Sequence, residues 1–403
     1  MAYGKKVLHS DIAPFVDGVQ IKRAQEFGHG VDLRSNPIQE IANTGVVQYI
    51  YDTPVVPFNL TVYETDVVWE LHKAMFNKAS DATQIKFPDD FIGALPCVDF
   101  AVPVRVDGTY DHTFWLSRCF VERFAIDFSN NDMIRTTYSG NGDLLVASLN
   151  AHKDGKVAVG TYVSASAFTV PVDISTGYAL IYARVNETLV PGSALTAGTY
   201  SGGKTTITVA SPYNVLAASD RIRLFYCKTS AGTFPALTTS AAIGGLRRAC
   251  ADVYLKPYGG SYGKWFRLQR LGLDVPLGTG EITEIGTKYP IDKSLNLPFN
   301  FNISVTATRN NLIDLAIFAG KDPATVTEIS VEDLVNNISN KADLKIEVYK
   351  SETDHSSSNF IERFTITNVT VTNLDARGAV GNAPLDITWT LQADNLTITN
   401  SYS

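Results

Sequence analysis

Apolar and polar residues alternate along most of this chain, which is the period-2 pattern of strands that bury one face. The alternation predicts strands over about 98–106, 117–128, 343–350 and 359–373. Two segments break the alternation. In 66–76, and again after Thr308, apolar residues recur three and four positions apart, as on one face of a helix. We therefore predict one short helix in each half of the chain, the first capped by Thr65 or Asp66 and the second by Thr308.

The pattern also repeats along the chain. Phe120–Ile126 and Phe360–Ile366 share five of seven residues at an offset of 240. Ile38–Ile41 resembles Ile282–Ile285 at an offset of 244, and weaker matches follow in the same order. Because several matches in one order at a nearly constant offset are not expected by chance, we predict an internal duplication.

The segment between the two copies, about 155–245, has no counterpart in either of them. It is rich in Ala, Ser, Thr and Gly, and its alternation predicts further strands. We therefore predict three domains, 1–154, 155–245 and 246–403. The predicted fold class is mainly β, with two tandem antiparallel β-sandwich or barrel domains, each carrying a flanking α-helix, and a small inserted β-domain.

The charge balance is mildly acidic. Of 403 residues, 34 are Lys or Arg and 41 are Asp or Glu, which gives a net charge of −7. This balance disfavours tight binding to duplex nucleic acid, which needs clustered cations. The sequence contains no apolar run of the roughly 20 residues that a membrane-spanning helix requires. No apolar stretch follows the charged N-terminus, so we expect neither a signal peptide nor a membrane partner.

Sequence motifs of catalysis are missing. The six histidines lack the spacing of zinc ligands, and there is no GxSxG nucleophile motif. Gly202–Thr205 resembles part of a phosphate loop, but the residues after it alternate as in a strand, where such a loop requires a helix. The four cysteines form no CxxC pair and are expected to be small buried side chains. We expect no enzymatic activity, no cofactor and no metal.

Four segments of the second half carry a resemblance to a known family. They are Arg267–Leu271, Glu281–Gly286, Asn302–Thr306 and Asn311–Leu315. In this order they resemble the first strand, the Glu-Ile-Gly element, the extended strand and the helix of the tail tube (major tail) proteins of tailed bacteriophages. The resemblance covers both predicted copies but not the insert.

The resemblance implies a structural subunit that forms rings. Tail tube proteins form six-fold rings that stack into a hollow tube for genome delivery, so a duplicated chain would form pseudo-hexameric rings of three chains. The implied partners are further copies of this chain, the tape measure, terminator and baseplate proteins and a sheath, with DNA passing through the lumen without specific binding. The implied location is the tail of a virion assembled in the host cytoplasm. The insert would project outward as a decoration.

Two groups of residues are candidates for contacts between subunits. The predicted hairpin at about 44–57 carries an apolar run that a lone domain would leave exposed. The Glu-Arg pair that recurs in both copies is either an ion pair between subunits or a pair of charges on a solvent-exposed strand. The predicted contact residues are Val46, Val47, Tyr49, Tyr51, Glu122, Arg123, Glu362 and Arg363.

Two other functions stay open at this point. One is a distal-tail or baseplate hub protein of a virion, which would occur in few copies per particle. The other is a carbohydrate-binding β-sandwich protein, for which surface tryptophans would be evidence. Trp69, Trp115, Trp265 and Trp389 all lie at apolar-face positions of predicted elements, which indicates core packing instead.

Overall fold

The computed structural model describes most of the chain, and every structural statement below concerns the residues it describes. These are residues 12–17, 19–32, 35–38, 48–51, 55–65, 67–79, 81–92, 95–106, 109–129, 133–149, 153–186, 188–229, 245–282, 292–309, 313–337, 340–377 and 385–400.

The fold is mainly β and antiparallel, as the alternation predicted. One sheet contains 17 strands, a second contains seven, and two further pairs of strands form hairpins. The strands before residue 150 are β1 (Phe15–Val16), β2 (Val19–Gln20), β3 (Ala24–His29), β4 (Ser35–Ile38), β5 (Gln48–Tyr51), β6 (Val56–Tyr63), β7 (Gln84–Phe87), β8 (Cys97–Val106), β9 (Thr109–Ser129), β10 (Arg135–Gly142) and β11 (Leu144–Leu149).

The strands of the second half follow the same plan. They are β19 (Ala251–Lys256), β20 (Gly263–Lys264), β21 (Leu268–Pro276), β22 (Thr279–Ile282), β23 (Asp292–Leu295), β24 (Phe301–Arg309), β25 (Ala342–Tyr349), β26 (Phe360–Arg377), β27 (Leu385–Ala393) and β28 (Asn395–Thr399). The first half pairs its strands in the order β3-β6-β10-β9-β8. The second half pairs its strands in the order β21-β24-β27-β26-β25.

Each half has a hairpin between its first two long strands and a helix after the second. The hairpins pair in equivalent register, because Ser35 lies opposite Tyr51 and Thr279 lies opposite Leu295, an offset of 244 for both partners. The helices are α1 (Val68–Met75) in the first half and α2 (Ile313–Phe318) in the second. A third helix, α3 (Val331–Asn336), follows α2 and begins with a capping box at Ser330, so the second half carries a helix that the sequence analysis did not predict.

The predicted cap of α2 is wrong, whereas that of α1 is partly right. Val67 occupies the N-cap position of α1 and makes no side-chain cap hydrogen bond. Thr65 lies two residues before it, and its hydroxyl accepts a hydrogen bond from the Val67 backbone N–H at 3.4 Å. Asp66, the other predicted cap, lies outside the described residues. Thr308 belongs to β24, where its hydroxyl donates a hydrogen bond to Asp386. Gly320 follows α2 with a positive φ of 68°, which is a common way for a helix to end.

The sheet register also corrects the strongest sequence match. β9 and β26 are equivalent at an offset of 250, not 240. Cys119 lies opposite Val98, and Val369 lies opposite Ala342, which is 244 residues after Val98. Two left-handed residues mark the same offset, Arg118 with φ 56° and Asn368 with φ 61°. The similar segments Phe120–Ile126 and Phe360–Ile366 therefore do not occupy equivalent places in the two halves.

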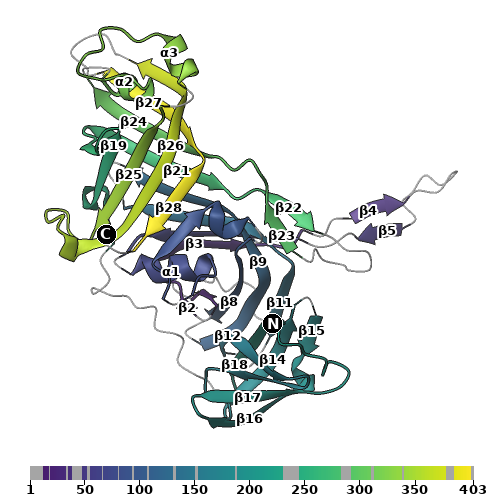
Figure 1. Cartoon of the computed structure of the whole chain (residues 1–403). Helices are drawn as coiled ribbons and strands as arrows, with labels where there is room; N and C mark the ends of the chain where they lie inside the picture. The colour runs from purple at the N-terminus through teal and green to yellow at the C-terminus, as the bar shows by residue number, and fades with distance from the viewer. Residues whose placement is uncertain are drawn as a thin grey trace.

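The insert forms the seven-stranded sheet, which lies at the opposite side of the first half from the second half (Figure 1). Its strands are β12 (Lys153–Ser164), β13 (Ala167–Val170), β14 (Tyr178–Val185), β15 (Thr188–Pro191), β16 (Leu195–Ser201), β17 (Lys204–Val209) and β18 (Ile222–Lys228). It has a core of its own. A second apolar cluster joins it to the first half, where Trp115 packs with Tyr182 and Phe225. The insert is therefore packed on the first half through a buried surface.

The core runs through both halves as one apolar cluster. All four tryptophans are buried, which confirms their predicted place in the core. Three of the four cysteines are buried, and among the described residues none of the four forms a disulfide bond. No helix in the described part of the chain is long and apolar enough to cross a membrane.

Candidate assembly interface

One strand pair joins the two halves into a continuous sheet. Residues 123–129, called here the second stretch of β9, pair with β21. The register runs from Arg123 opposite Pro276 to Ser129 opposite Arg270. On the buried face of this junction, Phe124 lies opposite Val275 and both side chains are fully buried. The junction therefore closes two strand edges that would otherwise be exposed.

Two ion pairs lie on the outer face of the junction. The Arg123 guanidinium donates to both carboxylate oxygens of Asp274, at 2.6 and 3.1 Å. Arg270 makes the same two-pronged contact with Asp127, at 3.2 and 2.9 Å. All four side chains are partly exposed, so these pairs specify the register more than they stabilise the fold.

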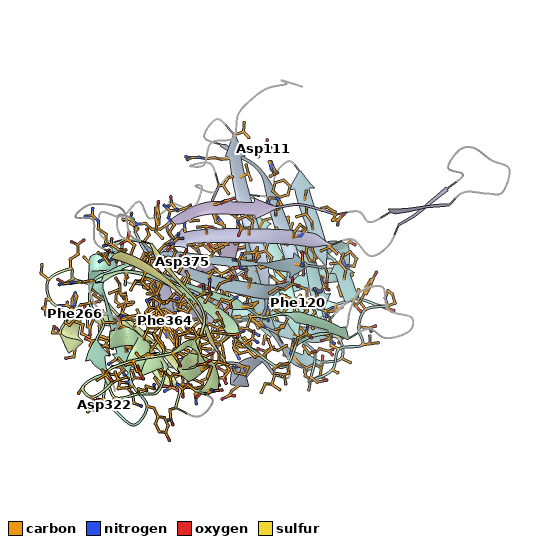
Figure 2. All side chains as sticks on the ribbon, turned by 90° about the horizontal axis from the view of Figure 1, so that it is seen from above. Asp111, Phe120, Phe266, Asp322, Phe364 and Asp375 are labelled. Atoms are coloured by element: carbon orange, nitrogen blue, oxygen red, sulfur yellow. The ribbon has the colours of Figure 1, made fainter. Side chains whose placement is uncertain are left out.

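The two strands that form the junction each have a counterpart in the other half of the chain, and each counterpart pairs on one edge only among the described residues. β3 is the counterpart of β21, and among the described residues it pairs only with β6. The 370–377 stretch of β26 is the counterpart of the second stretch of β9, and its pairing within the described part of the chain is with β27 alone. Asp375, labelled in Figure 2, lies in this stretch. Within the described part of the chain, both counterpart strands therefore have one edge that is not paired with another strand.

The predicted contact hairpin lies at the end of a long projection. Figure 1 shows β4 and β5 extending away from the rest of the molecule. Val46 and Val47 fall outside the described residues. Tyr49 and Tyr51 belong to β5, where they pair with Pro37 and Ser35. Their role as contacts between subunits stays a prediction.

The equivalent hairpin of the second half folds back onto the first half. The Leu95 backbone N–H donates to the Lys293 carbonyl at 3.0 Å. The Lys293 ammonium contacts the Glu122 carboxylate at 2.9 Å, and Leu295 is buried in the common core. Glu122 also accepts a hydrogen bond from Asn141. This predicted contact residue therefore connects β9 to β23 within the chain.

The other predicted charged residues also have partners within the chain. Arg123 bonds Asp274 across the junction, and its side chain remains 54% exposed. Arg363 contacts the Glu347 carboxylate on the neighbouring strand at 2.9 Å. Glu362 is buried, and its carboxylate lies 3.3 Å from His72 of α1. Contacts of these residues with another subunit stay predictions.

A buried polar network that the sequence analysis missed holds the insert. Arg223 of β18 contacts Asp17 and Asp99 at 3.7 and 3.4 Å. Burial raises the pKa of Asp17 to about 7, although the charge of Arg223 opposes this shift. A signal was present in the sequence, because Asp99 interrupts the apolar run of β8.

A second buried group of this network lies beside the first. Arg184 of β14 donates to Asp143 at 3.4 Å and to the Ser117 hydroxyl at 3.2 Å. Arg118 contacts the same Asp143 oxygen at 3.2 Å. The Ser117 hydroxyl in turn donates to Asp99 at 2.9 Å. The insert and the first half are therefore joined by charges that would be costly to separate.

No family model matches this sequence, and no curated protein matches it. Among solved structures, a chain of the sheath–tube complex of an extracellular contractile injection system (PVC) in its extended state matches with a TM-score of 0.25 and 14% identity, over 37% of this chain and 88% of that chain. A chain of the anti-feeding prophage cap, which terminates a tube, matches with a TM-score of 0.27 and 10% identity, over 37% of this chain and 95% of that chain.

Proposed function

We propose that this chain is a structural, non-enzymatic subunit of a tail tube, in which three chains form each pseudo-hexameric ring around a lumen for genome delivery. The observation that carries the proposal is the β9–β21 junction together with its two unpaired counterparts. The shared strand order and hairpin register support an internal duplication with domains 1–154, 155–245 and 246–403. A junction that exists once within the chain would then recur between chains.

The internal junction supports one register for the proposed external one. β3 precedes β21 by 244 residues, and the second stretch of β26 follows that of β9 by 250. Applied to the β9–β21 pairing, these offsets would bring Gly30 opposite the partner subunit's Asp375 and Val31 opposite the partner subunit's Leu374. The new strand pair is antiparallel and extends the sheet from one chain into the next.

The side chains along β3 fit such a junction. Val31 is 46% exposed in the single chain, whereas its counterpart Val275 is fully buried. Assembly in this register would cover Val31 with the partner's Leu374, which is half-buried against the core. The position equivalent to Arg270 is Glu26, and the position equivalent to Asp127 is Arg377. The sequence therefore has opposite charges at both places, with their signs exchanged.

The projecting hairpin fits the same symmetry. β22–β23 lies on the first half of its own chain through Lys293 and Leu295. By equivalence, β4–β5 would lie on the second half of the neighbouring subunit. The projection is then an arm that reaches the next chain, which supports the predicted contact role of Tyr49 and Tyr51.

Images and masses of the assembled protein test the proposal. Native mass spectrometry and averaged electron micrographs are expected to show rings of three chains and stacks of such rings. Closed rings of six full chains, or a protein that stays monomeric at high concentration, would contradict it. A single ring per virion would instead indicate a distal-tail or baseplate hub protein. The sheath, tape measure, terminator and baseplate partners, and the passage of DNA, belong to this proposal.

A further inference from the structure

Three ionisable side chains converge in the core between the two halves. Glu64 follows β6, His72 lies on α1, and Glu362 lies on β26 of the second half. All three are at most 1% exposed. One donor atom from each lies within 4.8 Å of the other two. None of the three residues lies on β3 or in the 370–377 stretch of β26, and the His72 ring lies 5.7 Å from that of Phe124 on the buried side of the β9–β21 junction.

Among the described residues, the three converging atoms make no hydrogen bond. They are Glu64 Oε2, His72 Nε2 and Glu362 Oε2, of which the last two lie 3.3 Å apart and form an ion pair if His72 is protonated. Buried polar atoms are nearly always hydrogen-bonded, and a buried carboxylate oxygen without a hydrogen bond is costly. Three such atoms facing one another are therefore arranged to donate electron pairs to one common ligand.

Two other polar atoms of the cluster are oriented by hydrogen bonds from β10. The Tyr138 hydroxyl lies 2.5 Å from His72 Nδ1. The Thr136 hydroxyl donates a hydrogen bond to Glu64 Oε1. Both residues belong to β10. Hydrogen bonds to the far atoms of metal ligands are usual, because they hold the tautomer of the imidazole and the orientation of the carboxylate. Here they leave Nε2 and Oε2 directed into the cluster.

The distance between His72 Nε2 and Glu362 Oε2 suits a small divalent ion. Zn²⁺ binds nitrogen and carboxylate oxygen at about 2.0–2.2 Å in tetrahedral geometry, which puts neighbouring ligand atoms about 3.3–3.6 Å apart. His72 Nε2 and Glu362 Oε2 are 3.3 Å apart. Two carboxylates would also balance the charge of a divalent ion in a site that excludes bulk water.

We propose that Glu64, His72 and Glu362 bind one divalent transition-metal ion of the Zn²⁺ type, with a water molecule in the fourth position. Because Glu64 and His72 belong to the first half and Glu362 to the second, the ion fastens α1 to β26. It is a structural ion, and its binding stabilises the contact between the halves.

Metal analysis of the full chain tests this site. The protein is refolded with and without Zn²⁺, dialysed, and measured by elemental analysis and thermal unfolding. We expect about one zinc per chain and a higher Tm for the zinc-loaded protein. Refolding with Co²⁺ is expected to produce the absorption bands of a tetrahedral cobalt site. Wild-type protein that retains no zinc and shows no cobalt bands would overturn the proposal.

Substitutions locate the ion. Glu64→Gln and Glu362→Gln keep the side-chain shape but remove a charged ligand, and each is expected to weaken zinc binding at least tenfold. His355→Gln is the matched control, because His355 pairs with Asp252 at 2.8 Å in a partly exposed site. Zinc binding that survives the double substitution Glu64→Gln/Glu362→Gln, or that is lost in the His355→Gln control, would place the ion elsewhere and refute this site.

Discussion

Arg23 and Arg267 share a left-handed backbone conformation, with φ of 56° and 63°, at an offset of 244 residues. Each backbone carbonyl accepts a hydrogen bond from a backbone N–H of the second long strand of its half. Arg23 accepts from Tyr63 of β6 at 3.2 Å, and Arg267 accepts from Thr308 of β24 at 3.1 Å. A non-glycine residue rarely adopts this conformation. Its recurrence at the start of β3 and β21 makes these strands counterparts, and the proposed register between subunits depends on that equivalence.

A cysteine cross-link tests this register. Val31→Cys combined with Leu374→Cys is expected to yield covalent oligomers up to trimers on oxidation, because directly opposed residues of paired strands have Cβ atoms about 4.5–5.5 Å apart. Non-reducing electrophoresis measures the product. The pair Val31→Cys/Asn373→Cys is the control, since a shift of one residue turns the second thiol to the other face. Equal cross-linking of both pairs would contradict the proposed register.

The projecting hairpin is expected to be required for assembly only. Val47→Asp combined with Tyr49→Asp should leave the circular dichroism spectrum and thermal unfolding of the single chain unchanged. The same variant should fail to form tubes, because charges would be placed in an apolar contact between subunits. Sedimentation and electron microscopy measure assembly. Normal tubes from this variant would show that the hairpin makes no such contact.

The raised pKa of Asp17 predicts that the free energy of unfolding depends on pH. Burial, together with the nearby Asp99 carboxylate, raises the pKa of Asp17 to about 7 in the folded chain, although the charge of Arg223 opposes this shift. The folded state therefore binds a proton that the unfolded state releases near pH 4, so this group lowers the free energy of unfolding as pH rises from about 4 to about 7. Asp17→Asn should flatten the curve of urea midpoint against pH in this window. An unchanged slope would contradict the assignment.

Buried and exposed arginines should differ in their contribution to stability. Arg184→Met removes a buried guanidinium from Asp143 and Ser117, and it is expected to lower the free energy of unfolding by about 1.5–3 kcal/mol, because Arg118 still contacts Asp143. Arg123→Met is the matched control, because its ion pair with Asp274 is half exposed and should cost at most about 1 kcal/mol. Urea unfolding of both variants measures the difference. Similar losses would refute the structural role of the buried network.

The strands, the helices and the burial of the tryptophans could be predicted from the sequence because each depends on local periodicity. The alternation at the start of β25 and the change of period at α1 and α2 are visible within about ten residues. The order of matching segments also indicated two copies.

The register of the copies depended on the tertiary structure. Glu122 and Thr372 are each an extra residue opposite the neighbouring strand, and bulges of this kind are set by the pairing partners, not by the strand alone. The similarity between Phe120–Ile126 and Phe360–Ile366 therefore pointed to an offset that the sheets do not have. For the same reason no local spacing revealed Glu64, His72 and Glu362, which only the packing of α1 against β26 brings together.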